Sequence, residues 1–227
     1  MPKKFGLLFI LSAPSGAGKS TIYRKLALRN KNVQFMVTCT TRLPRKGERN
    51  GRHYFFLTTE EFQRRIQAGS FVEWARVHDR YYGIPKERME ALLRQGKTVL
   101  LAVDVQGAQT LKEKYPGAVL SFLVPPSMDH LRRRLERRKE SRESIEKRLH
   151  RAEAELLHVV NYDYVVVNDR LPQAVRQFEA ILTAESLRVS RFLQNAPENL
   201  AVNWNGGHAW NRKSRKPKIQ RVYSPSV

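Results

Sequence analysis

The feature of this chain that most constrains its fold is the stretch from Phe5 to Thr21, FGLLFILSAPSGAGKST. Residues 5–11 are all apolar or glycine, as in a strand of a parallel sheet that helices cover on both faces. The small residues that follow resemble a phosphate-binding loop, in which glycines let successive backbone N–H groups approach phosphate oxygens and a lysine adds a positive charge. The next segment, IYRKLAL, predicts a helix, whose amino terminus also favours an anion.

This loop predicts a site for a nucleoside triphosphate. The full pattern G-x-x-x-x-G-K-[ST] has glycine where this chain has Ala13, and an ordinary turn rich in small residues is the alternative. The order of strand, glycines, Lys-Ser-Thr and helix favours the phosphate loop. The hydroxyl group of Ser20, which follows Lys19, is the expected magnesium ligand.

Strands alternate with helices along the chain, which predicts an α/β fold with a parallel sheet and ligands at the carboxyl ends of its strands. After the first helix, strands are expected at 35–38, 52–57, 71–77, 98–104, 118–124 and 163–169. Helices are expected at 60–69, 85–96, 106–114, 128–160 with a break at 141–144, and 172–194. Residues 79–83, DRYYG, are expected to form a turn.

The short strands near residues 35–82 lie where a minimal wound fold needs only a connection, so this block is an expected inserted subdomain. Its basic loop carries Arg42 and Arg45, and Tyr54 and Tyr82 stand on either side of the subdomain. Two guanidinium groups with phenolic hydroxyl groups are suited to binding a second phosphate.

Two carboxylates, Glu73 and Asp104, fall on predicted strands. Carboxylates in a nucleotide pocket can accept hydrogen bonds from the ring N–H and amino groups of guanine, a pair of donors that adenine lacks. The exposed face of a strand is the alternative interpretation of Glu73.

Arginines crowd the helical region after Pro126: Arg132, Arg133, Arg134, Arg137, Arg138 and, further on, Arg148. Like charges at this spacing repel one another, so the cluster destabilises a helix unless an anion is near. A lid that closes over a transferring phosphoryl group supplies such an anion. A solvated basic helix is the alternative.

The formal net charge of +21 favours polyanionic partners, either nucleic acid or nucleotides themselves. Residues 195–227 form a basic segment with interspersed aromatic residues, expected to be a disordered tail. Such a tail is a candidate for weak binding of single-stranded nucleic acid, and a solvated tail without function is the alternative.

The single cysteine, Cys39, excludes an internal disulfide and a cysteine-rich zinc site. No apolar run approaches the roughly 20 residues of a membrane helix. The apolar start of the chain runs directly into the phosphate loop, so it is interpreted as a first strand rather than as a signal peptide. We expect a cytoplasmic protein.

From about residue 5 to residue 194 the chain resembles the guanylate kinase family. The resemblance lies in six stretches that occur in the family's order: SAPSGAGKST, TTRLPRKGERNGRHYFF, FVEWARVHDRYYG, VDVQGAQ, LRRRLERRKESRESIEKRL and DYVVVND. The family commonly has alanine where this chain has Ala13. The resemblance implies ATP-dependent phosphorylation of GMP or dGMP to the diphosphate, with Mg²⁺, in purine nucleotide metabolism.

The resemblance also implies a P-loop core with helices on both faces of its parallel sheet, a GMP-binding subdomain and a helical lid. The expected division of residues 1–194 is a core of 1–34, 83–125 and 159–194, a GMP-binding subdomain of 35–82 and a lid of 126–158. Residues 195–227 would follow as the tail. Whether such a protein is a monomer or a homodimer stays open.

Site residues transfer from the family by position. The implied ATP-binding residues are Ala13, Pro14, Ser15, Gly16, Ala17, Gly18, Lys19, Ser20, Thr21 and Asn168, and the implied metal ligand is Ser20. The implied GMP-binding residues are Thr38, Arg42, Arg45, Tyr54, Glu73, Tyr82 and Asp104. The implied catalytic residues are Lys19, Arg42, Arg134, Arg138 and Arg148.

Three departures from the family pattern are visible. Ile84 replaces a serine or threonine whose hydroxyl group reaches guanine. Ala102 replaces an acidic residue two positions before Asp104, and the lid lacks a glycine after Arg138. Two alternatives therefore stay open: a guanylate-kinase-like binding module with reduced catalysis, and a kinase of another phosphorylated acceptor.

Overall fold

The computed structural model describes residues 6–77, 79–137 and 141–191. Its main sheet has five strands, all parallel, in the order β2-β7-β1-β8-β9. The strands span Val33–Phe35 (β2), Thr98–Ala102 (β7), Leu8–Ser12 (β1), Val119–Val124 (β8) and Tyr164–Val167 (β9). This arrangement confirms the α/β fold with a parallel sheet.

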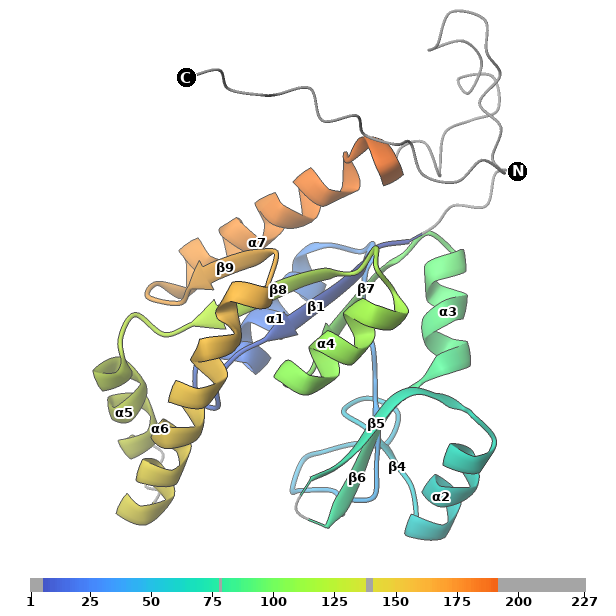
Figure 1. Ribbon diagram of the computed structural model, residues 1–227, viewed down its shortest axis with the longest axis horizontal. Helices are drawn as coiled ribbons and strands as arrows, with labels where there is room; N and C mark the ends of the chain where they lie inside the picture. Colours follow the sequence, from blue (N-terminus) through green and yellow to red (C-terminus); the bar gives the residue numbers. More distant parts are fainter. Residues whose placement is uncertain (1–5, 78, 138–140, 192–227) are drawn as a thin grey trace, which may run out of the picture.

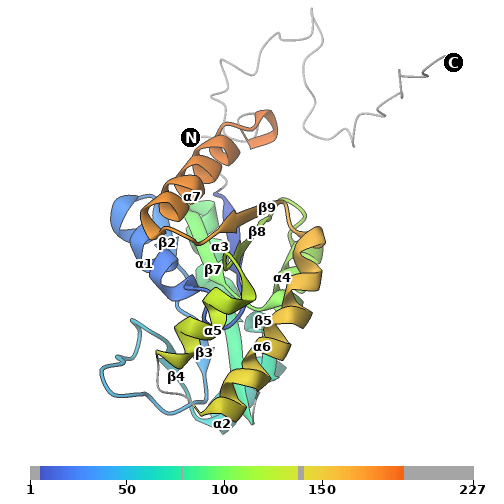
Figure 2. The same cartoon turned by 90° about the vertical axis from the view of Figure 1, so that its left-hand side faces the viewer.

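Helices cover both faces of this sheet (Figures 1 and 2). The helices α1 (Lys19–Arg29) and α7 (Leu171–Ser186) pack on one face, where Phe9 and Leu11 of β1 are buried. The helices α3 (Lys86–Arg94) and α4 (Val105–Lys114) pack on the other face, against Leu8 and Ile10. Because both faces are covered, every residue of β1 is buried, which explains the apolar run in the sequence.

A second, smaller sheet lies beside the main one (Figure 1). Its order is β4-β3-β6-β5, and β6 runs antiparallel to both of its neighbours. The elements are β3 (Cys39–Thr40), β4 (Phe55–Phe56), α2 (Thr59–Gln67), β5 (Phe71–Val77) and β6 (Arg80–Pro85). Val72 and Ile84 extend from it into the apolar cluster formed with α3 and α4, which fixes the small sheet to the core.

The helices α5 (Met128–Glu136) and α6 (Arg142–Leu156) pack side by side, and each contacts the phosphate loop (Figure 1). The 3-10 helix η1 (Leu157–Asn161) follows them. Their own apolar cluster joins them: Leu131, Leu135, Ile145, Leu149 and Ala152. The hydroxyl groups of Ser127 and Ser141 accept from backbone N–H groups of the first turns of α5 and α6. The break predicted at 141–144 was placed too late, because α5 ends at Glu136, Ser141 caps α6 and residues 142–144 already belong to α6.

Two strand predictions in the small sheet were wrong in extent. The segment 35–38 is not one strand, because Val33–Phe35 pairs with β7 of the main sheet and Cys39–Thr40 belongs to the small sheet. The chain crosses between the two sheets within this segment. Of the predicted strand 52–57, only Phe55–Phe56 forms a strand, and Tyr54 makes an isolated bridge with Asn50.

The predicted turn at 79–83 was also wrong in extent. Of these residues only Asp79, which has a positive φ of 56°, belongs to the reversal. Residues 80–85 form β6, in which Tyr81 pairs with Arg76 and Tyr82 with Ala75. Aromatic residues favour strands, and this partner strand outweighs the local turn composition.

Two element ends differ from the predictions. The helix predicted at 172–194 ends at Ser186, where Leu187 is its C-cap residue. The strand predicted to reach Asp104 ends at Ala102, and Asp104 instead caps α4.

Arg138 and the predicted tail at 195–227 lie outside the described residues. Among the described residues, no helix is both long and apolar enough to cross a membrane.

Candidate active site

The loop between β1 and α1 has the backbone geometry that its glycines predict. Gly16 and Gly18 have φ angles of 94° and 102°, which side chains rarely tolerate. A Cβ atom on Gly18 would also lie 2.5 Å from Nδ2 of Asn168. The first turn of α1 has neither a side-chain cap nor an acidic residue. Its N–H groups are therefore placed to receive an anion.

Asn168 and Arg134 brace this loop from two directions. The carbonyl oxygen of Ala17 accepts a hydrogen bond from Nδ2 of Asn168 at 2.7 Å and from Nη1 of Arg134 at 3.1 Å. Nη2 of Arg134 also donates to the carbonyl oxygen of Asn168 at 2.7 Å. Arg148, from α6, donates to the hydroxyl group of Ser15 at 3.3 Å. Two arginines of the predicted lid thus contact the phosphate loop.

Lys19 extends from the loop toward the end of β7. Its Nζ donates to the carbonyl oxygen of Val103 at 3.1 Å. Burial lowers the pKa of Lys19, while the carboxylates of Asp104 and Glu155 act in the opposite direction. Asp104 accepts from the N–H group of Gly107 at 2.9 Å, so one of its oxygens holds the amino terminus of α4.

A cavity of about 240 Å³ lies between the loop lysine and the small sheet. It brings together Lys19 and five of the seven predicted acceptor-binding residues: Thr38, Tyr54, Glu73, Tyr82 and Asp104. The other two, Arg42 and Arg45, do not line it. Residues far apart in the sequence therefore meet here, at the carboxyl ends of β1 and β7.

Glu73 is one of the two carboxylates that line this cavity. Burial raises its pKa to about 7, the charge of Asp104 adds to the rise, and Lys114 opposes it. Glu73 is half-buried, so the alternative of a solvated strand face does not describe it. Its carboxylate faces the start of α4, since a Cβ atom on Gly107 would lie 3.6 Å from Cδ of Glu73.

Arg42 lies at the tyrosine side of the cavity but is paired within its own loop. Its Nη2 donates to both carboxylate oxygens of Glu48 at 2.9 Å. Its guanidinium carbon stands 5.4 Å from the ring centre of Tyr54, whose ring is 6.1 Å from that of Tyr82. Arg45 is exposed, and its backbone N–H group donates to Glu48 at 2.7 Å.

Two carboxylates in this region were missed by the sequence analysis. Glu48 forms an ion pair with Arg42. Its position in the same glycine-containing loop as Arg42 is the sequence feature from which this pair could have been predicted. Glu155, on α6, interacts electrostatically with Lys19. No spacing rule links Glu155 to the loop, because the packing of α6 alone brings them near.

The departures Ile84 and Ala102 both line the cavity. Ile84 is 2% exposed and packs in the apolar cluster with α3 and α4, so it serves the core as well as the cavity wall. Its neighbour Gly83 is enclosed, since a Cβ atom there would lie 2.8 Å from Phe62 and from Phe71.

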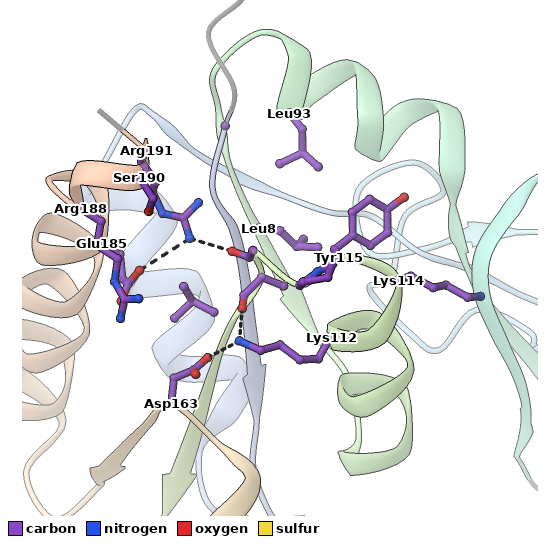
Figure 3. A pocket seen from close by; sticks show the side chains of 15 residues that line it. Leu8, Leu93, Lys112, Lys114, Tyr115, Asp163, Glu185, Arg188, Ser190 and Arg191 are labelled. Carbon is purple, nitrogen blue, oxygen red and sulfur yellow. Dashed lines mark hydrogen bonds and ion pairs between the residues drawn. The ribbon is translucent and has the colours of Figure 1, made fainter. Parts of the chain in front are cut away.

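A different cavity, of about 490 Å³, lies at the opposite, amino ends of the strands (Figure 3). Its charged side chains are largely paired with each other: Lys112 with Asp163 at 2.9 Å, and Arg188 and Arg191 with Glu185 at 2.8 and 3.6 Å. The phosphate loop and the acceptor-binding candidates lie away from it. This cavity is therefore separate from the candidate active site.

Comparisons with known proteins agree with this geometry. The family model described as guanylate kinase matches residues 6–185. A guanylate kinase of Caldanaerobacter subterraneus subsp. tengcongensis is 48% identical over 190 residues, which cover 83% of this chain and 92% of that protein. One of Desulfitobacterium hafniense is 46% identical over 84% of this chain and 96% of its own length.

A solved structure is similar as well. The crystal structure of guanylate kinase from Anaplasma phagocytophilum matches with a TM-score of 0.69 and 35% identity, over 83% of this chain and 90% of that one. Because the family model, the curated relatives and the solved structure all match guanylate kinases, the chain belongs to the guanylate kinase family.

Proposed function

We propose that this protein is an ATP-dependent guanylate kinase that phosphorylates GMP and dGMP. One observation carries the proposal: a single cavity joins Lys19 of the phosphate loop to the carboxylates of Glu73 and Asp104. A phosphoryl donor bound on the loop and a guanine held by the carboxylates would meet across it. Catalysis would then rest on positioning and on charge stabilisation, without a covalent intermediate.

The donor side of the site is formed by the loop residues Ala13 to Thr21 and by Asn168. Lys19 would follow the transferred phosphoryl group, and Arg134 and Arg148 would stabilise its developing charge. Both arginines contact the loop in the structure, Arg134 at the carbonyl oxygen of Ala17 and Arg148 at the hydroxyl group of Ser15. The proposed contribution of Arg138 concerns a residue outside the described part of the chain.

The acceptor side recognises both ends of GMP. Thr38, Glu73 and Asp104 would contact guanine, whose ring N–H and amino groups donate to carboxylates. Arg42, Arg45, Tyr54 and Tyr82 would bind the phosphate, with Glu48 holding Arg42 in place until the ligand arrives. We propose a corresponding division into a core of 1–34, 83–125 and 159–194, a GMP-binding subdomain of 35–82 and a lid of 126–158.

We further propose a requirement for Mg²⁺. The hydroxyl group of Ser20, which follows Lys19 in the first turn of α1, is an oxygen donor of the kind this ion accepts. The described residues contain no group of three or more His, Cys, Asp or Glu side chains placed to hold a metal. An ion held by this hydroxyl group together with substrate phosphates and water would neutralise phosphate charge.

The cytoplasm, where nucleotides are plentiful, is the proposed location.

The acceptor preference tests this proposal. In a coupled assay of ADP release, we expect turnover with GMP and dGMP and little with AMP, CMP or UMP. The Lys19→Met variant should lose about 10²–10³-fold in kcat, whereas Lys25→Met, an exposed position on the same helix, should retain activity. Turnover that prefers another acceptor, or none with GMP, would show a different kinase or a binding module.

The raised pKa of Glu73 predicts a pH dependence. Guanine needs the ionised carboxylate, and a pKa of about 7 in the free protein means that this form is lost as pH falls through 7. The value of kcat/KM for GMP should therefore fall about tenfold between pH 8 and pH 6. Glu73→Gln should lower kcat/KM by about 10- to 100-fold.

The control for this pH dependence is the Glu73→Gln profile itself, since the GMP phosphate titrates equally in both proteins. The limb near pH 7 should disappear in the variant. An identical limb in both proteins would assign it to the substrate and contradict the prediction.

Ile84 offers a test of base contact. Ile84→Thr should lower the KM for GMP by about two- to tenfold, because the new hydroxyl group can hydrogen-bond guanine for about 0.5–1.5 kcal/mol. Ile84→Val is the matched control, because valine has the shape of threonine but no hydroxyl group. If valine and threonine give the same KM, the hydroxyl group makes no such contact.

A further inference from the structure

The strand β5 is irregular at the point where it borders the cavity. Between Phe71 and Glu73 the partner strand β6 advances by one residue while β5 advances by two, so Val72 is the extra residue of a β-bulge. A bulge bends its strand and changes the direction of the side chains beside it. The residue that follows Val72 is Glu73, one of the two carboxylates of the cavity.

The bulge places Val72 and Glu73 on the same side of the small sheet. The side chain of Val72 is buried in the apolar cluster that contains Ile84 and residues of α4. Glu73 lines the cavity together with Ile84, the residue with which it pairs. Regular alternation would have placed Glu73 on the opposite face, where Phe71 stacks on Phe62. The direction of the Glu73 side chain therefore depends on the bulge.

Lys114, in the last turn of α4, binds the backbone of this bulge. Its Nζ donates to the carbonyl oxygen of Val72 at 2.5 Å. Figure 3 shows the lysine side chain extending away from the other charged side chains of the amino-end cavity. The extra residue of a bulge lies outside the regular ladder, so its carbonyl group is open to a donor from a neighbouring element. An ammonium group is a strong donor for it.

The same helix also holds the second carboxylate. Asp104 is the N-cap residue of α4 and accepts from the N–H group of Gly107 at 2.9 Å. A Cβ atom on Gly107 would lie 3.4 Å from Oδ1 of Asp104 and 3.6 Å from Cδ of Glu73, so both carboxylates border the first turn of α4. The start of α4 thus binds one carboxylate, and its last turn binds the backbone beside the other.

The charge of Lys114 suits this arrangement. Burial raises the pKa of Glu73, Asp104 adds to the rise, and the ammonium group of Lys114 opposes it. Lys114 therefore favours the ionised form of Glu73, which is the form that accepts from guanine. The other ionisable side chains that line the cavity are Lys19, Tyr54 and Tyr82.

We propose that Lys114 is a positioning residue for the acceptor: by binding the carbonyl group of Val72, it fixes the bulge that directs Glu73 into the cavity. This role rests on the proposed kinase function, because it affects catalysis only if Glu73 contacts guanine. The competing role is purely structural, in which Lys114 only attaches the small sheet to α4.

Kinetics of Lys114→Met, which keeps a long side chain and removes its charge, separate these roles. We expect the KM for GMP to rise about tenfold, while the KM for ATP stays unchanged. The limb of kcat/KM for GMP near pH 7 should move to higher pH, because the cation that opposes the raised pKa of Glu73 is lost. Lys114→Arg, which keeps the charge and the donors, should restore the wild-type KM.

Lys112→Met is the matched control. Lys112 belongs to the same helix and also donates to a backbone carbonyl group, that of Ala118, but it does so at the amino-end cavity. This variant should keep the wild-type KM for GMP and the wild-type pH limb, whatever its effect on the melting temperature.

A measurement without substrate reports on Val72 itself. Val72–Glu73 is the one place in the sequence where glutamate follows valine. Protein labelled with ¹³C at the valine carbonyl carbons and ¹⁵N at glutamate therefore gives a single peak that correlates the carbonyl group of Val72 with the amide group of Glu73. This peak should move in Lys114→Met and stay in place in Lys112→Met.

Three results would overturn the positioning role. One is an unmoved Val72 peak in Lys114→Met, and another is an unchanged KM for GMP. The third is a rise in the KM of both substrates together with a lower melting temperature, which would indicate a general loosening of the fold. Failure of GMP turnover in the wild type, with a shifted Val72 peak in Lys114→Met, would count against the proposed function alone.

Discussion

The carbonyl group of Ala17 is the point on which the site depends, because it accepts hydrogen bonds from Asn168 and Arg134 together. Asn168 follows the edge strand β9, and Arg134 lies on α5. A single peptide group thus joins the loop, the sheet edge and the predicted lid. Gly18 must remain glycine for this junction to close, since the amide of Asn168 occupies the space of a side chain. The conformation of the loop and the position of α5 consequently depend on the same peptide group.

Two distinct requirements meet at Lys19. The loop and its arginines are suited to any nucleoside triphosphate, and nothing in them selects an acceptor. We propose that selection falls to the cavity beyond Lys19, where burial, and after it the charge of Asp104, raises the pKa of Glu73. Guanine has two donors that can hydrogen-bond to these carboxylates. The surroundings that raise the pKa of Glu73 and the proposed specificity of the cavity therefore involve the same two side chains.

Sequence alone predicted the elements whose pattern is local. The strand at Leu8–Ser12 is buried on both faces and α2 begins at a threonine cap, so composition and spacing were sufficient. The strand at Arg80–Pro85 was missed because it depends on its partner β5, and the cap role of Asp104 was missed because β7 ends early. Family resemblance supplied most candidate residues, and the cavity gathers many of them. Glu48 and Glu155 emerged only from packing, since each acts on a charge that its own neighbours in sequence do not reveal.

Recognition of guanine by the two carboxylates is tested most directly by comparing GMP with IMP as acceptors. IMP keeps the ring N–H group and lacks the amino group, so it removes one donor without changing the phosphate. We expect kcat/KM for IMP to be lower by about tenfold or more, and Glu73→Gln to narrow this difference. Equal kcat/KM values for GMP and IMP in the wild type would contradict the assignment of Glu73 and Asp104 as the guanine-reading pair.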